Sequence, residues 1–306
     1  LAEAIVAKAA QSVGDDVAKT PITPSLMTVT DLKNYQAKKR EPVCTTYRSS
    51  YYICTMSPPS SGGIAIAQSL GILENFDLSQ YGPTNPSNEG GVPSVMGVHL
   101  VSEAQRLAYA DRDKYVADTD FIPLPGNGVS SMIDKAYLKQ RASLINANGN
   151  SMGTATAGDL GNVPLGVDKT VEKGTTHFSI VDAYGNVVSM TSTVESSMGS
   201  YHMVGGFLLT NQLTDFSVQP TDAAGVPVAN RVAPGKRPRS TMAPTLVFKG
   251  TGPGEFVMAT GSPGGGTIIQ YVLKTVVGAL DWGLDAQQAT SLVNFGATNS
   301  PTTNVD

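Results

Sequence analysis

Apolar residues recur at helical spacing through much of the first half of the chain. The stretch IAIAQSLGILENF follows a loop rich in Pro, Ser and Gly, and the longer stretch VHLVSEAQRLAYADRDKYV follows a second Gly/Pro-containing loop. A shorter stretch opens at Thr30-Asp31, which supplies an N-cap. The predicted helices cover residues 1–12, 31–39, 64–76, about 98–116 and about 131–145.

The pattern changes to short strands in the second half. THFSIVD and NVVSMTSTV are two predicted strands joined by the turn sequence Ala183-Tyr184-Gly185-Asn186. Further strands are predicted at GGFLLT, APTLVF and EFVMAT, and the Gly-rich GSPGGG then opens a helix, TIIQYVLKTVVGAL. Because helices come first, then strands, with little βαβ alternation, we expect an α+β protein with a layered sheet.

A segment of different composition separates the two halves. Between Asn146 and Lys173 the chain is poor in large apolar residues and rich in Gly, Asn, Thr and Ala. Such a segment cannot build a core, so we expect an exposed, mobile connector, which is also where proteolysis concentrates.

The two cysteines bracket the sequence CTTYRSSYYIC. If this stretch is a β-hairpin, Cys44 and Cys54 lie opposite one another near its open end. A disulfide would indicate an oxidising compartment, and two reduced, buried thiols are the alternative.

Composition narrows the functional classes. The 306 residues are 41% hydrophobic and 15% charged, as in a globular protein. The net charge of −4 leaves no basic surplus for phosphates, so we expect no nucleic-acid partner. No apolar run approaches the ~20 residues of a membrane-spanning helix. The chain opens with LAEAIVAKAAQS, without Met or an N-cap, and we expect it to be an excerpt of a longer chain.

Several familiar catalytic patterns are missing from the sequence. His99, His177 and His202 are the only histidines, and none shows metal-ligand spacing. No GxSxG or HExxH motif occurs, and GSPGGG lacks the Lys-Ser/Thr of a phosphate-binding loop. Gly264 and Gly265 could still expose their N–H groups to an anion just before a helix, although a packing turn is the alternative.

A hydrolase without histidine chemistry needs another base. A threonine at a chain N-terminus provides one, because its own α-amine can accept the hydroxyl proton during attack. The Gly174–Thr175 peptide has a suitable setting for generating such a terminus, since a connector precedes it and a strand follows it. An ordinary threonine at a strand start is the alternative.

The assembled motifs resemble the gamma-glutamyltranspeptidase family over nearly the whole chain. The matching blocks, in family order, are PPSSGG (58–63), ILENFD, EAQRLAYADRDKYV, TTHFSIVDAYGNVV, GGFLLTNQLTDFS, PGKRPRSTMAPTLVF and GSPGGG. The resemblance implies the four-layer αββα sandwich of N-terminal-nucleophile hydrolases, here incomplete at both ends. It also implies self-cleavage between Gly174 and Thr175. Residues 1–174 would then be the C-terminal part of a large subunit and 175–306 the N-terminal part of a small one, intertwined in one domain.

The resemblance assigns catalytic roles to four residues. Thr175 matches the nucleophile, whose freed amine is the base, and Thr193 matches the threonine that supports it. Gly264 and Gly265 match the backbone pair of the oxyanion hole, in agreement with the anion site considered above.

Five further residues match the family's substrate-binding positions. Gln212 and Asp215 match residues that hold the substrate's α-ammonium, and Ser240 and Thr241 match the hydroxyl pair at its α-carboxylate. Glu195 stands where many members have Asn, Thr241 replaces a Ser, and the loop 217–236 lacks the aromatic residue with which some members close the pocket.

The family's carboxylate-binding arginine belongs upstream of Leu1. None of Arg48, Arg106, Arg231, Arg237 and Arg239 matches it, and we interpret Arg237 and Arg239 as structural loop residues.

The resemblance implies a gamma-glutamyl hydrolase and transferase acting on glutathione-like donors, with water or an amino acid or peptide as acceptor. No metal or organic cofactor is implied, and a periplasmic or secreted location is expected. A glutaryl or cephalosporin-type acylase of the same family and a non-catalytic family member are the alternatives.

Overall fold

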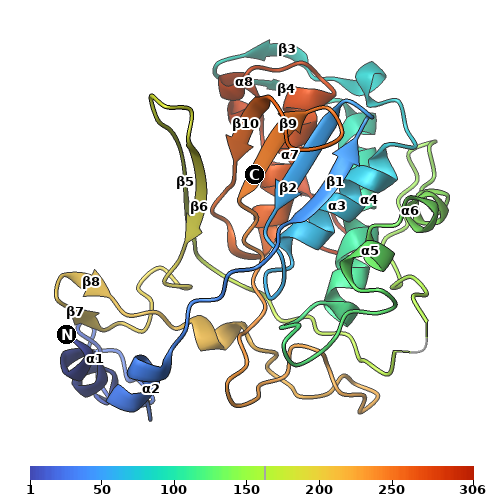
Figure 1. The fold of residues 1–306 in the computed structure, drawn as a ribbon. Helices are drawn as coiled ribbons and strands as arrows, with labels where there is room; N and C mark the ends of the chain where they lie inside the picture. Colours follow the sequence, from blue (N-terminus) through green and yellow to red (C-terminus); the bar gives the residue numbers. More distant parts are fainter. Residues whose placement is uncertain (162) are drawn as a thin grey trace.

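The computed structural model describes residues 1–161 and 163–306, so Asn162, within the predicted connector, lies outside the described residues. An antiparallel sheet of four strands, in the order β1-β2-β9-β10, forms its centre (Figure 1). The strands are β1 Val43–Tyr47, β2 Tyr51–Thr55, β9 Thr245–Lys249 and β10 Phe256–Thr260. Strands from both ends of the chain therefore build one sheet.

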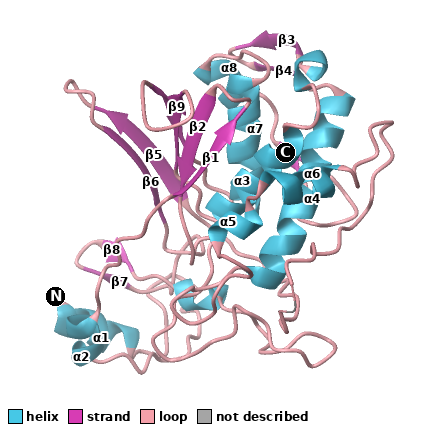
Figure 2. Ribbon diagram, turned by 45° about the vertical axis from the view of Figure 1, so that its right-hand side comes forward, coloured by secondary structure: helices cyan, strands magenta, loops and turns pink. Residues whose placement is uncertain are grey.

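Three helices cover one side of this sheet (Figures 1 and 2). They are α3 Gly62–Leu73, α4 Val95–Tyr115 and α7 Ile268–Leu280. Helix α3 is largely apolar, with Gln68 and Ser69 as its polar side chains, and every one of its residues is buried because it packs against the sheet, α4 and α7 at once. The main hydrophobic core lies in this layer. The structure is therefore α+β, as predicted.

The shorter helices correct two predicted boundaries. The helix predicted at 31–39 is α2 Val29–Asn34, and its N-cap is Thr28, not Thr30, because Thr28 and Asp31 form a reciprocal capping box. The helix predicted at 131–145 is divided into α5 Val129–Met132 and α6 Lys135–Ala142. Asp134 accepts a hydrogen bond from the Tyr137 N–H and so begins a new helix.

The remaining elements are short. The other helices are α1 Ala2–Ala9, α8 Ala286–Ser291 and the 3₁₀ turns η1 Leu78–Tyr81, η2 Gln212–Asp215 and η3 Gly265–Thr267. The other strands are β3 Thr84–Ser87, β4 Gly90–Val92, β5 Thr176–Val181, β6 Val187–Ser192, β7 Met203–Val204, β8 Phe207–Leu208, β11 Phe295–Gly296 and β12 Asn304–Val305. The strand predicted at GGFLLT is thus only two residues long.

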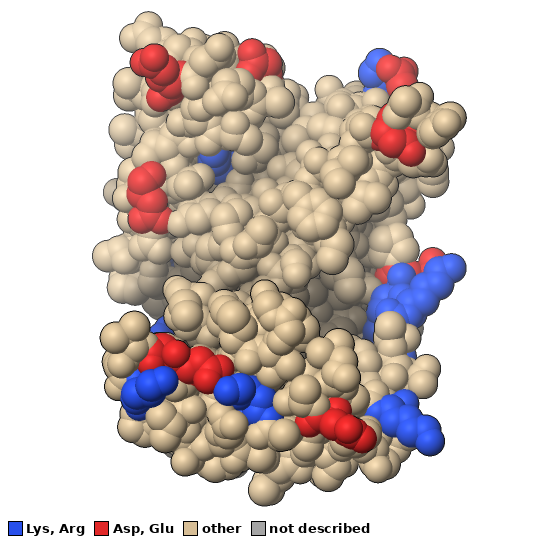
Figure 3. Space-filling view, turned by 90° about the vertical axis from the view of Figure 1, so that its left-hand side faces the viewer, with Lys and Arg blue, Asp and Glu red and all other residues tan. Residues whose placement is uncertain are grey.

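The hairpin β5–β6 projects beside β10 (Figures 1 and 2). The Ser189 hydroxyl ties it to β10 by donating to the Thr260 carbonyl at 3.0 Å. On the opposite face, the cross-strand pairs Phe178–Met190 and Ile180–Val188 leave four apolar side chains between 41% and 54% exposed. Figure 3 views the molecule from this side, and the central part of that face carries no charged side chains.

Most described residues of the connector are exposed or partly exposed, as predicted, but a few are buried and held in place. Its described residues form no helix or strand, but Gly158, Asp168 and Glu172 are buried. Polar groups hold it in place: the Gly158 N–H donates to the Asp111 carboxylate at 2.7 Å, and the Asp168 N–H donates to the Asp113 carbonyl at 2.9 Å. Backbone hydrogen bonds to buried acceptors can therefore fix a segment that has few large apolar side chains.

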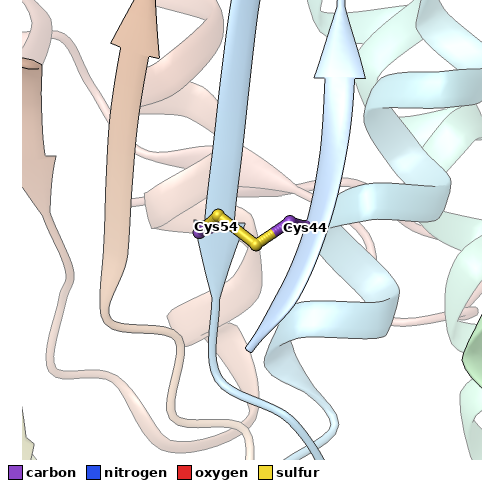
Figure 4. The surroundings of a disulfide bond; sticks show 2 residues. All are labelled: Cys44 and Cys54. Carbon is purple, nitrogen blue, oxygen red and sulfur yellow. A yellow bond between two sulfur atoms is a disulfide. The ribbon is translucent and has the colours of Figure 1, made fainter. Parts of the chain in front are cut away.

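Cys44 and Cys54 form a disulfide between β1 and β2 (Figure 4). The two residues are directly opposite in the antiparallel register. No helix in the described part of the chain is long and apolar enough to cross a membrane.

Candidate active site

A small pocket gathers residues from widely separated parts of the chain. It is lined by Glu172, Lys173, Thr175, Thr193, Gln212, Asp215, Ser240, Thr241, Met242 and Gly265. Its volume of about 10 Å³ leaves room for little more than a water molecule. Most of the predicted site residues therefore meet at one place, whereas among the described residues Gly174, Gly264 and Glu195 lie outside this lining.

The junction before β5 has an unusual backbone. Thr175 has φ +136°, a conformation that costs a residue with a side chain on the order of 1–3 kcal/mol. Gly174 has φ +68°, and a Cβ atom there would lie 1.4 Å from the Glu195 carbonyl oxygen. Position 174 thus requires glycine both for its conformation and for its close contact.

The Gly-rich loop faces this junction. The Gly265 N–H donates to the Gly174 carbonyl at 3.0 Å, and the Gly266 N–H donates to the Glu172 carbonyl at 3.1 Å. Gly264 and Gly265 have φ +132° and +53°, and a Cβ on Gly265 would lie 2.4 Å from the Glu172 carbonyl oxygen. The loop therefore places an N–H donor on the carbonyl of the peptide bond between Gly174 and Thr175.

Thr193 and Glu195 form a tight turn after β6. The Glu195 N–H donates to the Thr193 Oγ at 2.8 Å, and Glu195 has φ +73°. The buried Glu195 carboxylate accepts a hydrogen bond from the Asn211 side chain. Asn211 also accepts from the Ser196 N–H at 3.1 Å, so this amide side chain holds the turn from both sides.

Asp215 is a buried acid with one free oxygen. It is 3% exposed, and within the described chain its Oδ1 has no hydrogen-bond partner, whereas Gln212 donates to its Oδ2. Burial and, less strongly, the negative charges of Glu172 and Glu195 raise the pKa of Asp215 to about 7. This carboxylate is therefore arranged to accept a cationic group.

Ser240 and Thr241 are held by different neighbours. The Ser240 carbonyl accepts from both the N–H and the hydroxyl of Ser61, each at 2.7 Å, so the PPSSGG loop supports this segment. The Thr241 hydroxyl donates to the Gly265 carbonyl at 2.6 Å. In this arrangement the Thr241 hydroxyl holds the Gly-rich loop.

A buried ion network beneath the pocket was not predicted. Arg112 pairs with Glu172 and, at 2.8 Å, with Asp113, and Arg239 pairs with Asp168 at 3.2 Å and Glu172 at 3.5 Å. The charged residues within the otherwise apolar pattern of α4 are the sequence feature that could have indicated this network. The network confirms the structural interpretation of Arg239, and Arg237 likewise donates to a backbone carbonyl, that of Gln36, at 2.7 Å.

The histidines are bonded outside the pocket. His177 lies 2.9 Å from the Thr191 hydroxyl, and burial lowers the pKa of His177. His99 and His202 contact the carbonyls of Asn146 and Gln11. The described residues contain no group of His, Cys, Asp and Glu that could hold a metal ion.

Comparison with known proteins identifies the family. The family model described as gamma-glutamyltranspeptidase matches residues 1–305, so the chain belongs to this family. The chain is 39% identical over 281 residues to the glutathione hydrolase proenzyme of Escherichia coli (strain K12), covering 88% of this chain and 44% of the relative. The corresponding proenzyme of Bacillus subtilis (strain 168) is 39% identical over 275 residues, covering 86% and 43%. The chain thus spans somewhat less than half the length of these curated relatives.

A solved structure supports the fold. The cephalosporin acylase from Bacillus halodurans superposes with a TM-score of 0.71 at 23% identity, covering 91% of this chain and 45% of that chain. At this identity the similarity concerns the fold alone.

Proposed function

We propose that the protein is a gamma-glutamyl hydrolase and transferase that acts on glutathione and related compounds through an acyl-enzyme on Thr175. The observation that carries the proposal is the pocket in which Thr175, the Gly265 N–H group and the unpaired Asp215 oxygen meet. Membership of the gamma-glutamyltranspeptidase family and the glutathione hydrolase relatives support the same reaction.

The first step is cleavage of the Gly174–Thr175 bond by the protein itself. The Thr175 hydroxyl attacks the Gly174 carbonyl carbon, whose oxygen already accepts the Gly265 N–H. The C–N bond breaks, the hydroxyl proton passes to the released Thr175 amine, and Gly174 becomes an ester on the Thr175 oxygen. Water then hydrolyses this ester, which yields a Gly174 carboxylate and restores the hydroxyl.

The freed Thr175 then acts on the substrate. Its amine accepts the hydroxyl proton during attack on the side-chain carbonyl of the gamma-glutamyl group, and Thr193 supports the nucleophile. N–H groups of Gly264 and Gly265 stabilise the oxyanion, and the departing amine takes the proton. Water or an amino-acid or peptide acceptor releases the glutamyl group. Because the terminal amine is the base, the proposed reaction uses no metal or organic cofactor.

The charged head of the glutamyl group sets the specificity. Asp215, Gln212 and Glu195 bind its α-ammonium, and the Ser240 hydroxyl donates to its α-carboxylate. Thr241, the second member of the matched hydroxyl pair, donates its O–H to the Gly265 carbonyl and so holds the loop beside that carboxylate. The free Oδ1 of Asp215 supports this assignment, because a buried carboxylate oxygen without a donor favours a cation.

The cleaved protein consists of two subunits in one fold. Residues 1–174 belong to the large subunit and 175–306 to the small one, within a four-layer αββα sandwich. The Cys44–Cys54 disulfide supports a periplasmic or secreted location, because disulfides persist in oxidising compartments.

Replacing the nucleophile tests the proposal. Thr175→Ala should give one uncleaved chain without gamma-glutamyl hydrolysis, whereas the matched Thr176→Ala variant should still yield a fragment whose N-terminal residue is Thr175. Intact mass and N-terminal sequencing of both variants provide the measurement. A Thr175→Ala protein that still splits at this bond contradicts the proposed nucleophile.

An acylase for dicarboxylic side chains is the second candidate, since the fold resembles that of a cephalosporin acylase. A glutaryl group lacks the α-ammonium, so the buried Asp215 oxygen favours gamma-glutamyl donors. Rates on gamma-glutamyl and glutaryl anilides should differ strongly, and equal rates would reject the preference. A protein inactive on both would be a non-catalytic family member.

A further inference from the structure

Helix α4 contacts both the connector just before Thr175 and the Gly-rich loop through two residues one turn apart. The Tyr109 hydroxyl donates to the Gly266 carbonyl at 2.5 Å, and the Arg112 guanidinium lies 5.3 Å from the centre of the Tyr109 ring. Arg112 in turn pairs with the Glu172 carboxylate. The Glu172 carbonyl accepts the Gly266 N–H at 3.1 Å. The four residues Tyr109, Arg112, Glu172 and Gly266 therefore form a closed ring of contacts.

This ring fixes the orientation of the Gly-rich loop. Glycine has the widest conformational freedom of any residue, so a run of three glycines has no rigidity of its own. Both backbone polar groups of Gly266 are held by the ring. Those of the adjacent Gly265 are held by the Thr241 hydroxyl at its carbonyl and by the Gly174 carbonyl at its N–H. With the Tyr109 and Thr241 hydroxyls holding two carbonyls of the loop, the Gly265 N–H stays directed at the Gly174 carbonyl of the reacting peptide bond.

Cleavage changes the two halves of the ring differently. Glu172 precedes the Gly174–Thr175 bond and belongs to the segment that is cut away from Thr175. Tyr109 lies on α4, in the protein core, and is 2% exposed. Its contact with Gly266 does not depend on whether the bond is intact.

We infer that Tyr109 is a positioning residue that fixes the Gly-rich loop at Gly266 and thereby orients the neighbouring Gly265 N–H, first for self-cleavage and then for gamma-glutamyl transfer. The inference rests on the proposed function and deepens it. Tyr109 is not among the residues that line the pocket, so it acts through the loop. Losing its hydroxyl leaves the Gly266 carbonyl without that donor and lets the glycines rotate.

The chain offers a matched control on the same helix. Tyr115 is 1% exposed, and its hydroxyl donates to the Gly158 carbonyl at 2.7 Å. Tyr115→Phe therefore removes the same kind of buried hydrogen bond from α4 without touching the Gly-rich loop. Tyr109→Phe and Tyr115→Phe should lower the melting temperature by similar amounts.

The experiment compares both variants with the wild type in the full chain. Tyr109→Phe should slow self-cleavage and lower kcat for a gamma-glutamyl anilide by about tenfold to a hundredfold, with KM little changed, because small misplacements of donors cost this much. Tyr115→Phe should keep wild-type values of all three quantities.

The outcomes are distinct. Wild-type cleavage and kcat in Tyr109→Phe, or an equal loss in Tyr115→Phe, would overturn the positioning role and leave the proposed function standing. A wild-type chain that neither cleaves nor turns over substrate would overturn both.

Discussion

At the scale of single residues, the backbone between the connector and β5 allows few side chains. Gly174, Thr175 and Glu195 all have positive φ values, and the Glu195 carbonyl occupies the space that a side chain at 174 would need. Such conformations persist only where surrounding contacts impose them, and they concentrate at functional sites. Here the contacts impose them beside the bond proposed to be cut.

Adding a methyl group at position 174 tests the effect of the close contact with Glu195 apart from the effect of a positive φ value alone. Gly174→Ala should slow self-cleavage by at least about a hundredfold, because its Cβ would displace the Glu195 turn or the scissile peptide. Gly185→Ala is the control, since Gly185 has φ +82° with no atom within 4 Å of the added Cβ. Time courses on denaturing gels measure both, and wild-type cleavage of Gly174→Ala would contradict the expected contact.

The raised pKa of Asp215 predicts how donor binding depends on pH. With its pKa at about 7, Asp215 is largely protonated at pH 6 and cannot pair with an α-ammonium. The KM for a gamma-glutamyl donor should therefore rise by up to about tenfold per pH unit below 7 and level off above it. Steady-state kinetics from pH 5.5 to 8.5 measure this, and Asp215→Asn should raise KM and remove the slope. A pH-independent KM in the wild type would exclude this role.

The resemblance to the family's motifs allowed most of the pocket residues to be predicted. Thr175, Thr193, Gln212, Asp215, Ser240 and Gly265 belong to motifs in the chain and share one pocket. By contrast, Tyr109, Arg112 and Glu172 matter through contacts between segments far apart in sequence. No spacing rule within one element reveals such contacts, because they depend on how α4 packs against the connector.

At the scale of elements, periodicity located the helices better than it located their ends. The predicted helix at 98–116 is α4, Val95–Tyr115, but the division between α5 and α6 depends on one capping side chain, Asp134. The connector is mostly exposed, as predicted, but its few buried residues were not predicted. Its composition predicted exposure, yet the backbone groups of Gly158 and Asp168 find buried partners across the fold.

The disulfide between β1 and β2 should contribute measurably to stability. The loop it closes spans a sequence separation of 10 residues, and the loss of chain entropy in the unfolded state corresponds to about 3 kcal/mol. The double variant Cys44→Ser/Cys54→Ser should lose roughly that amount in urea unfolding. Wild-type protein with its disulfide intact and wild-type protein treated with reductant are the reference samples. Equal unfolding midpoints in all samples would rule out this contribution.

At the scale of the whole molecule, the central sheet joins the two sides of the proposed cut. Strand β2 pairs with β9 from Tyr51–Lys249 to Thr55–Thr245, and the main core includes residues from α3, α4 and α7. The fragments 1–174 and 175–306 should therefore remain together after cleavage and separate only on unfolding.

Because both fragments contribute strands to this sheet, refolding should differ between the intact and the cleaved chain. An intact chain refolds in a unimolecular reaction, whereas two fragments must first find one another, so their refolding is bimolecular. Denatured Thr175→Ala protein should refold at a rate that does not depend on protein concentration. Cleaved wild type should refold more slowly the more it is diluted, because its two fragments must first associate. Light scattering and circular dichroism on a dilution series measure the difference. If the connector is cut as proposed, the folded protein would persist chiefly through slow unfolding, since at low concentration the separated halves would seldom meet again.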